Sequence, residues 1–245
     1  VRQARLIGDT LWLAAYHDGI FAYSLADPEH PLEELHLEIP GPNITFALRG
    51  NMIVVGNGTE DSPLGVYVFE PDGTFVEAAR FGDFHVASID FVHGYLVATG
   101  YYKAHPRVYA LDDPACPLLV YEDAAPEYWS GFLYGRHYIQ IPHVDDISGN
   151  TVYRRLDLME PAFPAEAGTF RADSRLIAMI DSAMAVGYYH VRGLSVLKGG
   201  PATGYWTAAI ISDDLDYDLN LFGGCSPPYF VISDRLWVLE NRIMP

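Results

Sequence analysis

Short apolar stretches recur along the chain at nearly even intervals, and each has the β-branched or aromatic enrichment of a strand. The stretches begin at Leu11, Met52, Tyr95, Tyr138, Ala183 and Tyr229, and successive starts lie between 41 and 46 residues apart. Self-similarity at such a period indicates repeated supersecondary units that bury their apolar faces against one another. The pattern therefore predicts a repeat protein.

Each interval reads as four strands separated by turn signals, with no convincing helical periodicity. In the first interval the strands are expected at residues 1–8, 10–16, 19–25 and 32–39. Four strands in about 40 to 50 residues are typical of a β-propeller blade. We predict an all-β protein, a β-propeller of six four-stranded blades, with five or seven blades as the alternatives.

The single domain, residues 1–245, divides into blades at about 1–41, 42–82, 83–125, 126–171, 172–214 and 215–245. The last interval supplies only three strands before Pro245, so this blade is expected to be incomplete.

Paired prolines mark the boundary between the third and fourth strands in several of the repeated intervals. They are Pro28 and Pro31, Pro114 and Pro117, and Pro161 and Pro164. A PxxP stretch can bind an aromatic groove, but it can also form a rigid turn, because proline sets φ and lacks a donor N–H. Recurrence at one strand boundary favours the turn.

The first unit also carries a family resemblance. The stretch GDTLWLAAYHDGIFAYSLADPEHP, residues 8–31, resembles the LVIVD repeat, a propeller-type bacterial repeat that ends in Asp-Pro-x-x-Pro. The match is good in the first and third units and partial in the fourth. The resemblance implies a propeller fold and an extracellular or cell-surface location, and it implies no shared catalytic residues.

The charge balance excludes some partners. The formal net charge is −17, from 32 acidic residues against 15 Lys and Arg. Such an acidic protein repels nucleic acid and anionic lipid. No apolar run approaches the roughly 18 residues needed to span a bilayer, so membrane insertion is not expected. The chain begins Val1-Arg2, and we expect it to be a processed form or part of a larger chain.

Aromatic and histidine side chains are predicted to gather on one face. In an up-and-down blade, the turn after the second strand and the connection between blades lie at the end opposite the proline turns; we call this end the rim. The residues expected there are Tyr16, His17, Tyr101, Tyr102, Trp129, His143, Tyr188, Tyr189 and His190. Amphipathic rings form good recognition surfaces, although Tyr and His also occur as half-buried strand-end residues. We predict that the rim binds a carbohydrate, a peptide or a protein.

Metal binding is the less favoured interpretation of the same residues. His17, His143 and His190 could approach the propeller axis as transition-metal ligands, but no short-range His pair supports them. Asp214, Asp216 and Asp218 resemble the start of a calcium loop, but Leu219 and Cys225 replace its turn Gly and its bidentate Glu. No cofactor is predicted.

The chain lacks a nucleophile elbow, a P-loop and a dinucleotide-binding motif. The sequence therefore favours a non-catalytic binding or scaffolding module over an enzyme. Two alternatives remain: a metal-dependent hydrolase or lyase with its site in the axial funnel of the same face, and a purely architectural domain.

Overall fold

In the described part of the computed structural model, every regular element is a β-strand. The structure describes residues 3–57, 61, 63–72, 74–100, 106–123, 128–134, 136–142, 151–173, 175–179, 184–189, 193–200, 202, 204–212, 229–232 and 235–238. Within these ranges, no helix is long and apolar enough to cross a membrane.

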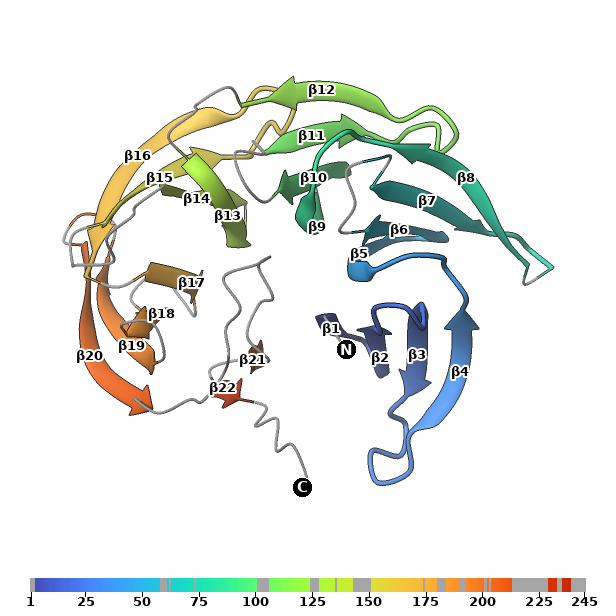
Figure 1. Ribbon diagram of the computed structural model, residues 1–245, viewed down its shortest axis with the longest axis horizontal. Coiled ribbons are helices and arrows are strands. Elements are labelled where there is room, and N and C mark those ends of the chain that lie inside the picture. Colours follow the sequence, from blue (N-terminus) through green and yellow to red (C-terminus); the bar gives the residue numbers. More distant parts are fainter. Residues whose placement is uncertain are drawn as a thin grey trace. The chain divides into compact units, whose positions relative to one another are not determined.

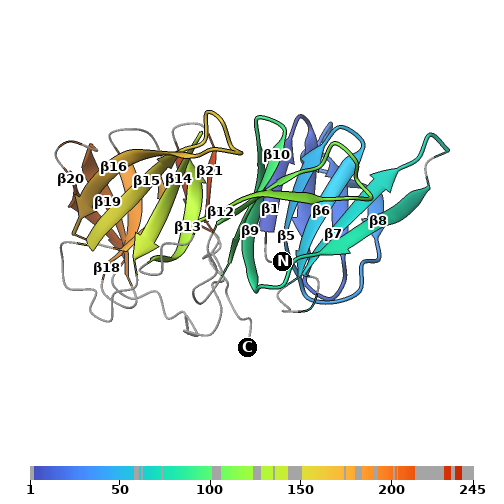
Figure 2. The ribbon, with the colours of Figure 1, turned by 90° about the horizontal axis from the view of Figure 1, so that it is seen from above.

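The first three sheets each contain four consecutive antiparallel strands, labelled in Figure 1. The first sheet consists of β1 (Gln3–Ile7), β2 (Thr10–Ala14), β3 (Ile20–Ser24) and β4 (Leu32–Leu37). The second consists of β5 (Asn43–Arg49), β6 (Met52–Asn57), β7 (Leu64–Phe69) and β8 (Phe75–Phe81), which lie side by side in Figure 2. The third consists of β9 (Val86–Val92), β10 (Tyr95–Gly100), β11 (Arg107–Ala110) and β12 (Leu118–Glu122).

The next eight strands form two antiparallel groups of four that share one sheet. The groups are β13 (Tyr128–Tyr134), β14 (His137–Pro142), β15 (Thr151–Asp157) and β16 (Ala165–Ala172), then β17 (Arg175–Met179), β18 (Met184–Tyr189), β19 (Gly193–Gly200) and β20 (Gly204–Ser212). Their outer strands meet through a parallel pairing of Ala172 with Tyr205, which the sequence pattern did not predict. Finally, β21 (Tyr229–Ile232) pairs with β22 (Arg235–Val238).

The prediction of an all-β chain built from antiparallel four-stranded sheets is confirmed. The number of blades, the closure of the propeller and the blade boundaries stay predictions. The chain divides into two compact units. The first unit contains Val1–Phe91, Leu111–Pro117 and Cys225–Pro245, and the second contains Val92–Ala110 and Leu118–Gly224.

The core of the first unit lies between the first two sheets. Ala14, Ile20 and Leu37 from the first sheet pack against Phe46 and Ile53 from the second. All six residues of β6 are buried, as expected for a central strand that is covered on both faces. At Gly56, a Cβ atom would lie 2.6 Å from Thr45 Cγ2 and 2.8 Å from Val86 Cγ1, so the absence of a side chain permits this close packing.

The proline pairs form turns, as the sequence predicts. The N–H of His30 donates to the Asp27 carbonyl at 3.1 Å, and the N–H of Cys116 donates to the Asp113 carbonyl at 3.0 Å. The corresponding bond from Phe163 to the Glu160 carbonyl measures 2.8 Å. In each case the first proline follows the accepting residue, where its fixed φ suits a β-turn, and the second immediately precedes the fourth strand.

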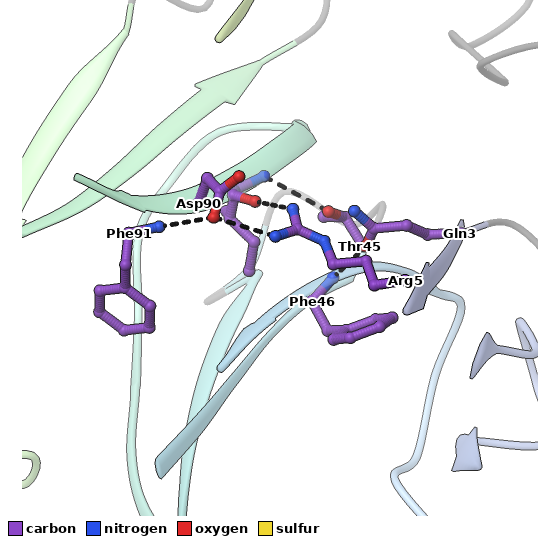
Figure 3. A network of polar contacts seen from close by, with 7 residues as sticks. Gln3, Arg5, Thr45, Phe46, Asp90 and Phe91 are labelled. Atoms are coloured by element: carbon purple, nitrogen blue, oxygen red, sulfur yellow. Dashed lines mark hydrogen bonds and ion pairs between the residues drawn. The ribbon is translucent and has the colours of Figure 1, made fainter. Parts of the chain in front are cut away.

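Polar side chains join the first strands of neighbouring sheets in the first unit (Figure 3). Arg5 on β1 donates to Asp90 Oδ1 and to the Ile89 carbonyl on β9, each at 2.9 Å. Gln3 Oε1 accepts a bond of 2.6 Å from the N–H of Phe46 on β5. Thr45 Oγ1 in turn accepts from the N–H of Ile89 at 3.3 Å. We call Gln3, Arg5, Thr45 and Asp90 the inner-strand network.

The second unit has its own apolar core and a buried polar cluster. Val97 and Val108 pack with Tyr138 and Leu156. Beside them, the Asp123 carboxylate accepts hydrogen bonds from Gln140 Nε2 at 2.5 Å and from Arg154 Nη1 at 2.9 Å. Arg154 Nη1 also donates to Gln140 Oε1 at 3.1 Å. Gln140 and Asp123 are buried, so the cluster satisfies polar groups that water cannot reach.

A turn residue offers a first test of these local structures. Gly8, Gly50 and His93 occupy the same position in the two-residue turns between first and second strands, with φ of 61°, 60° and 47°. A left-handed backbone costs a non-glycine residue about 1 kcal/mol. We therefore expect His93→Gly to raise the free energy of urea unfolding by up to about 1 kcal/mol. Gly50→Ala, with open space around its Cβ, should lower it by a similar amount; destabilisation by His93→Gly would contradict this explanation.

The polar cluster of the second unit offers another test. Arg154→Met removes a cation from the buried Asp123 carboxylate, and loss of one partner of a buried pair costs about 3 kcal/mol or more. Arg136→Met is the matched control, because the Arg136 side chain is half exposed where it pairs with Asp157 and should contribute less than about 1 kcal/mol. Equal losses of unfolding free energy in the two variants would show that the cluster is not a buried ion pair in solution.

Candidate functional site

The structure describes part of the predicted rim. The side chains of Tyr16 and His17 are described, whereas Tyr101, Tyr102, His143, His190, Asp214, Asp216 and Asp218 lie outside the described residues. Tyr188 and Tyr189 are the last two residues of β18. Trp129 was expected in a connection between two blades. It lies instead within β13, where the pairing register shifts between Tyr128 and Ser130.

Tyr16 lies in a tight turn between β2 and β3. The N–H of Asp18 donates to the Ala15 carbonyl at 3.2 Å, and the N–H of Ala15 donates to the Gly19 carbonyl at 2.9 Å. Tyr16 takes the second position of this turn with a φ of 60°. Turns with positive φ at this position favour Gly, Asn or Asp, so an aromatic residue there is an outlier.

Two features fit this turn against β4 (Leu32–Leu37). Gly19 has a φ of 87°, and a Cβ atom on it would collide with the Leu37 carbonyl of β4, so glycine is required there. Across the sheet, His36 Nε2 lies 2.7 Å from the Asp18 carbonyl. Because a carbonyl only accepts, Nε2 must carry a proton in this contact. The turn therefore packs closely against β4 at Gly19 and is joined to it by the contact of His36 with Asp18.

The anchored turn presents an aromatic pair. The rings of Tyr16 and His17 lie 4.2 Å apart, edge to face at 68°. Tyr16 is half-buried and His17 is exposed. Edge-to-face aromatic pairs are favourable beyond the area they bury, so the two rings stabilise each other's positions. The result is a preorganised surface with one ring available to solvent.

The rim also includes a residue of the second sheet that was not among the predicted site residues. Asn57, at the end of β6, donates from Nδ2 to the Pro40 carbonyl at 3.4 Å. Gly41 has a φ of 102°, and its Cβ position lies 3.3 Å from Asn57 Nδ2. Asn57 is buried, and its Oδ1 has no hydrogen-bond partner among the described residues. Counting from the strand starts places Asn57 level with Tyr16, which is the signal that could have identified it.

The described residues contain no group of three or more His, Cys, Asp or Glu side chains that could hold a metal ion. Of the predicted metal ligands, only His17 belongs to the described part. The axial-metal and calcium hypotheses therefore stay untested predictions. What the described rim offers is hydrogen bonding and aromatic contact.

Comparisons with known proteins identify the fold but no family. No family model and no curated protein matches the sequence. Among solved structures, a candidate 6-phosphogluconolactonase from Bacteroides uniformis matches with a TM-score of 0.58 and 11% identity, over 86% of this chain and 69% of that one. A chain of the mitotic checkpoint complex matches at 0.56 and 9% identity, over 84% and 64%. The N-terminal domain of Nup159 matches at 0.55 and 10% identity, over 84% and 60%.

These neighbours include WD40 and other propeller-like folds. This chain spans less than two thirds of the length of the last two of them, and identities this low show the fold alone. The protein therefore belongs to the class of all-β proteins with a propeller-like fold. The narrower resemblance to the LVIVD repeat stays a prediction.

The geometry of the turn predicts that removing the Tyr16 ring affects the stability of the protein less than adding a side chain at Gly19. Tyr16→Gly removes the ring and relieves a left-handed backbone that costs about 1 kcal/mol. We expect its free energy of unfolding to change by less than about 1 kcal/mol, measured by urea denaturation. Gly19→Ala should be clearly destabilised, because it adds both the φ penalty and a collision with Leu37. A larger loss in Tyr16→Gly than in Gly19→Ala would mean that the Tyr16 ring serves the fold.

Proposed function

We propose that this chain is a non-catalytic binding or scaffolding module whose rim recognises a protein or peptide ligand. The observation that carries the proposal is Tyr16, an aromatic residue held at a φ of 60° beside the exposed His17 ring. A residue in a costly backbone conformation persists only where its surroundings enforce it, and such residues cluster at functional sites. The turn therefore presents the exposed His17 ring, supported by the half-buried Tyr16 ring, at low entropic cost on binding.

The fold supports a protein partner over other ligands. Propeller-like neighbours often act as protein-binding scaffolds, and one of those matched here comes from a multiprotein complex. The formal net charge of −17 favours a partner surface with basic or neutral character. Carbohydrate stays a second possible ligand class. We further propose a six-bladed propeller of the LVIVD type, placed outside the cell or on its surface, as the sequence resemblance implies.

A peptide selection tests the proposed function. The purified chain is used to enrich binders from a displayed library of random peptides, and affinities are then measured for wild type and Tyr16→Ser/His17→Ser. We expect the double variant to bind at least about tenfold more weakly, which corresponds to about 1.4 kcal/mol. Phe163→Ser, on an exposed proline-turn residue, is the matched control and should bind as wild type does.

Enriched peptides that bind wild type and the double variant equally would contradict the role of this turn. Tyr101 and Tyr188 then test the remainder of the predicted rim in the same assay. A glycan array, run in parallel, distinguishes the carbohydrate alternative.

A metal-dependent hydrolase or lyase with its site in the axial funnel is the second candidate, as the sequence analysis left open, and one structural neighbour is named as a candidate lactonase. Elemental analysis of the purified chain distinguishes the two. A stoichiometric transition metal that is lost when His17, His143 and His190 are replaced would favour the enzyme over the binding module.

A further inference from the structure

The outer strand of the third sheet, β12 (Leu118–Glu122), has a free edge. Among the described strands it pairs with β11 alone, and Figure 1 shows it outermost in its sheet. An edge strand presents a row of backbone N–H and C=O groups with which another chain can pair. Folded proteins blunt such edges with bulges and with charged side chains. The outer strands of this chain differ in the second of these two devices.

β4 and β8 also end their sheets, and they carry both kinds of protection. On each of the three outer strands, one residue pairs with a tyrosine of the neighbouring strand just before a bulge. The pairs are Tyr23 with Glu33, Tyr67 with Glu77 and Tyr109 with Leu119. All three strands therefore have the bulge, but β4 and β8 place an exposed glutamate beside it and β12 places a leucine there. The edge of β12 lacks the protecting charge.

The edge of β12 is apolar as well as uncharged. Leu118 is 62% exposed and Leu119 is 44% exposed. Successive side chains on a strand point to opposite faces, so apolar surface flanks the free edge on both faces of the sheet. Val120 and Tyr121 are half-buried and pack against the apolar core of the second unit. The free edge is therefore exposed, while the strand that bears it is held by its core contacts.

The described structure contains one example of an outer strand that another strand extends. β16 pairs in parallel with β20 at Ala172 and Tyr205. The pairing lies at the end of β16 away from Glu166, the residue that pairs with Leu156 beside the bulge of that strand. An outer edge of this chain therefore accepts a further strand at a point away from its glutamate.

The charge of the chain distinguishes between possible occupants of the β12 edge. The formal net charge is −17, so a second copy of this chain would meet like charge. The one charged residue of β12 is an acid, Glu122, which pairs with Arg107 at 2.8 Å. A basic segment gains long-range attraction from the net charge, whereas an acidic segment is repelled. The charge therefore favours a basic segment of another protein.

We propose that the free edge of β12 binds an extended, positively charged segment of another protein by strand addition. The backbone of that segment pairs with β12, and its alternate side chains contact Leu118 on one face and Leu119 on the other. The main-chain hydrogen bonds supply affinity, and the two leucines select apolar residues at the facing positions. This surface shares no residue with the rim and does not depend on the ligand proposed for the rim.

A peptide selection against a chain that lacks the rim rings tests the proposal. Tyr16→Ser/His17→Ser is used to enrich binders from a displayed library of random peptides, and affinities are then measured with Leu119→Glu added to the same chain. We expect the enriched peptides to alternate apolar residues with others and to carry net positive charge. Leu119→Glu should weaken their binding at least tenfold, because it restores the glutamate that β4 and β8 carry. Leu32→Glu is the matched control: Leu32 is 67% exposed on β4, and its replacement should leave binding unchanged.

Hydrogen exchange of the whole chain, read by mass spectrometry, locates the bound peptide. We expect amide exchange in 118–122 to slow at least tenfold when an enriched peptide binds, because N–H groups of the free edge become hydrogen-bonded. Exchange in 32–37, on β4, should stay unchanged.

A library that yields no binder, or peptides that bind equally well after Leu119→Glu is added, would overturn the proposal. Enriched peptides with net negative charge would also overturn it. A wild-type dimer that Leu119→Glu converts to monomer, measured by light scattering, would assign the edge to a second copy and reject the proposed occupant. Should Leu119→Glu lower the free energy of urea unfolding, Leu118→Glu replaces it, and unchanged binding by that variant rejects the proposal.

Discussion

The inner-strand network is the constraint on which the arrangement of the first unit depends. Arg5 cannot remain three-quarters buried unless its guanidinium finds acceptors, and it finds them on β9 in Asp90 and the Ile89 carbonyl. Gln3 and Thr45 bond backbone N–H groups of β5 and β9 in the same way. Hydrogen bonds to backbone groups are directional, so they set how β1, β5 and the part of β9 up to Phe91 lie relative to one another, which apolar packing alone leaves adjustable.

The rim follows from that arrangement. Once the first two sheets are packed face to face, the Leu37–Gly41 segment runs between the turn that holds Tyr16 and the end of β6 that holds Asn57. Gly19 and Gly41 permit these close approaches, because any side chain there would meet the Leu37 carbonyl or the Asn57 amide. The candidate site is thus made of strand ends and turns held by the first two sheets. This is where propeller-like proteins can vary their surfaces without changing their cores.

Some features were predictable because they depend on local chemistry. Alternating apolar residues with a regular period identified the strands from Leu11 to Tyr229, and the repeated prolines identified the turns at Pro28, Pro114 and Pro161. Others were not. Trp129 was assigned to a connection but lies in β13, because a register shift there extends the strand beyond its apolar pattern. The parallel pairing of Ala172 with Tyr205 joins residues whose sequence environments carry no signal of each other.

The sequence by itself determined that this protein is all-β and repeats four-stranded units, since strand period and turn chemistry act over a few residues. The tertiary structure alone decided which side chains join neighbouring sheets, as Arg5 with Asp90 and Arg154 with Asp123. It alone also decided that Tyr16 adopts a left-handed backbone. These outcomes depend on groups that lie far apart in the chain and become neighbours only when the sheets pack, so no local pattern encodes them.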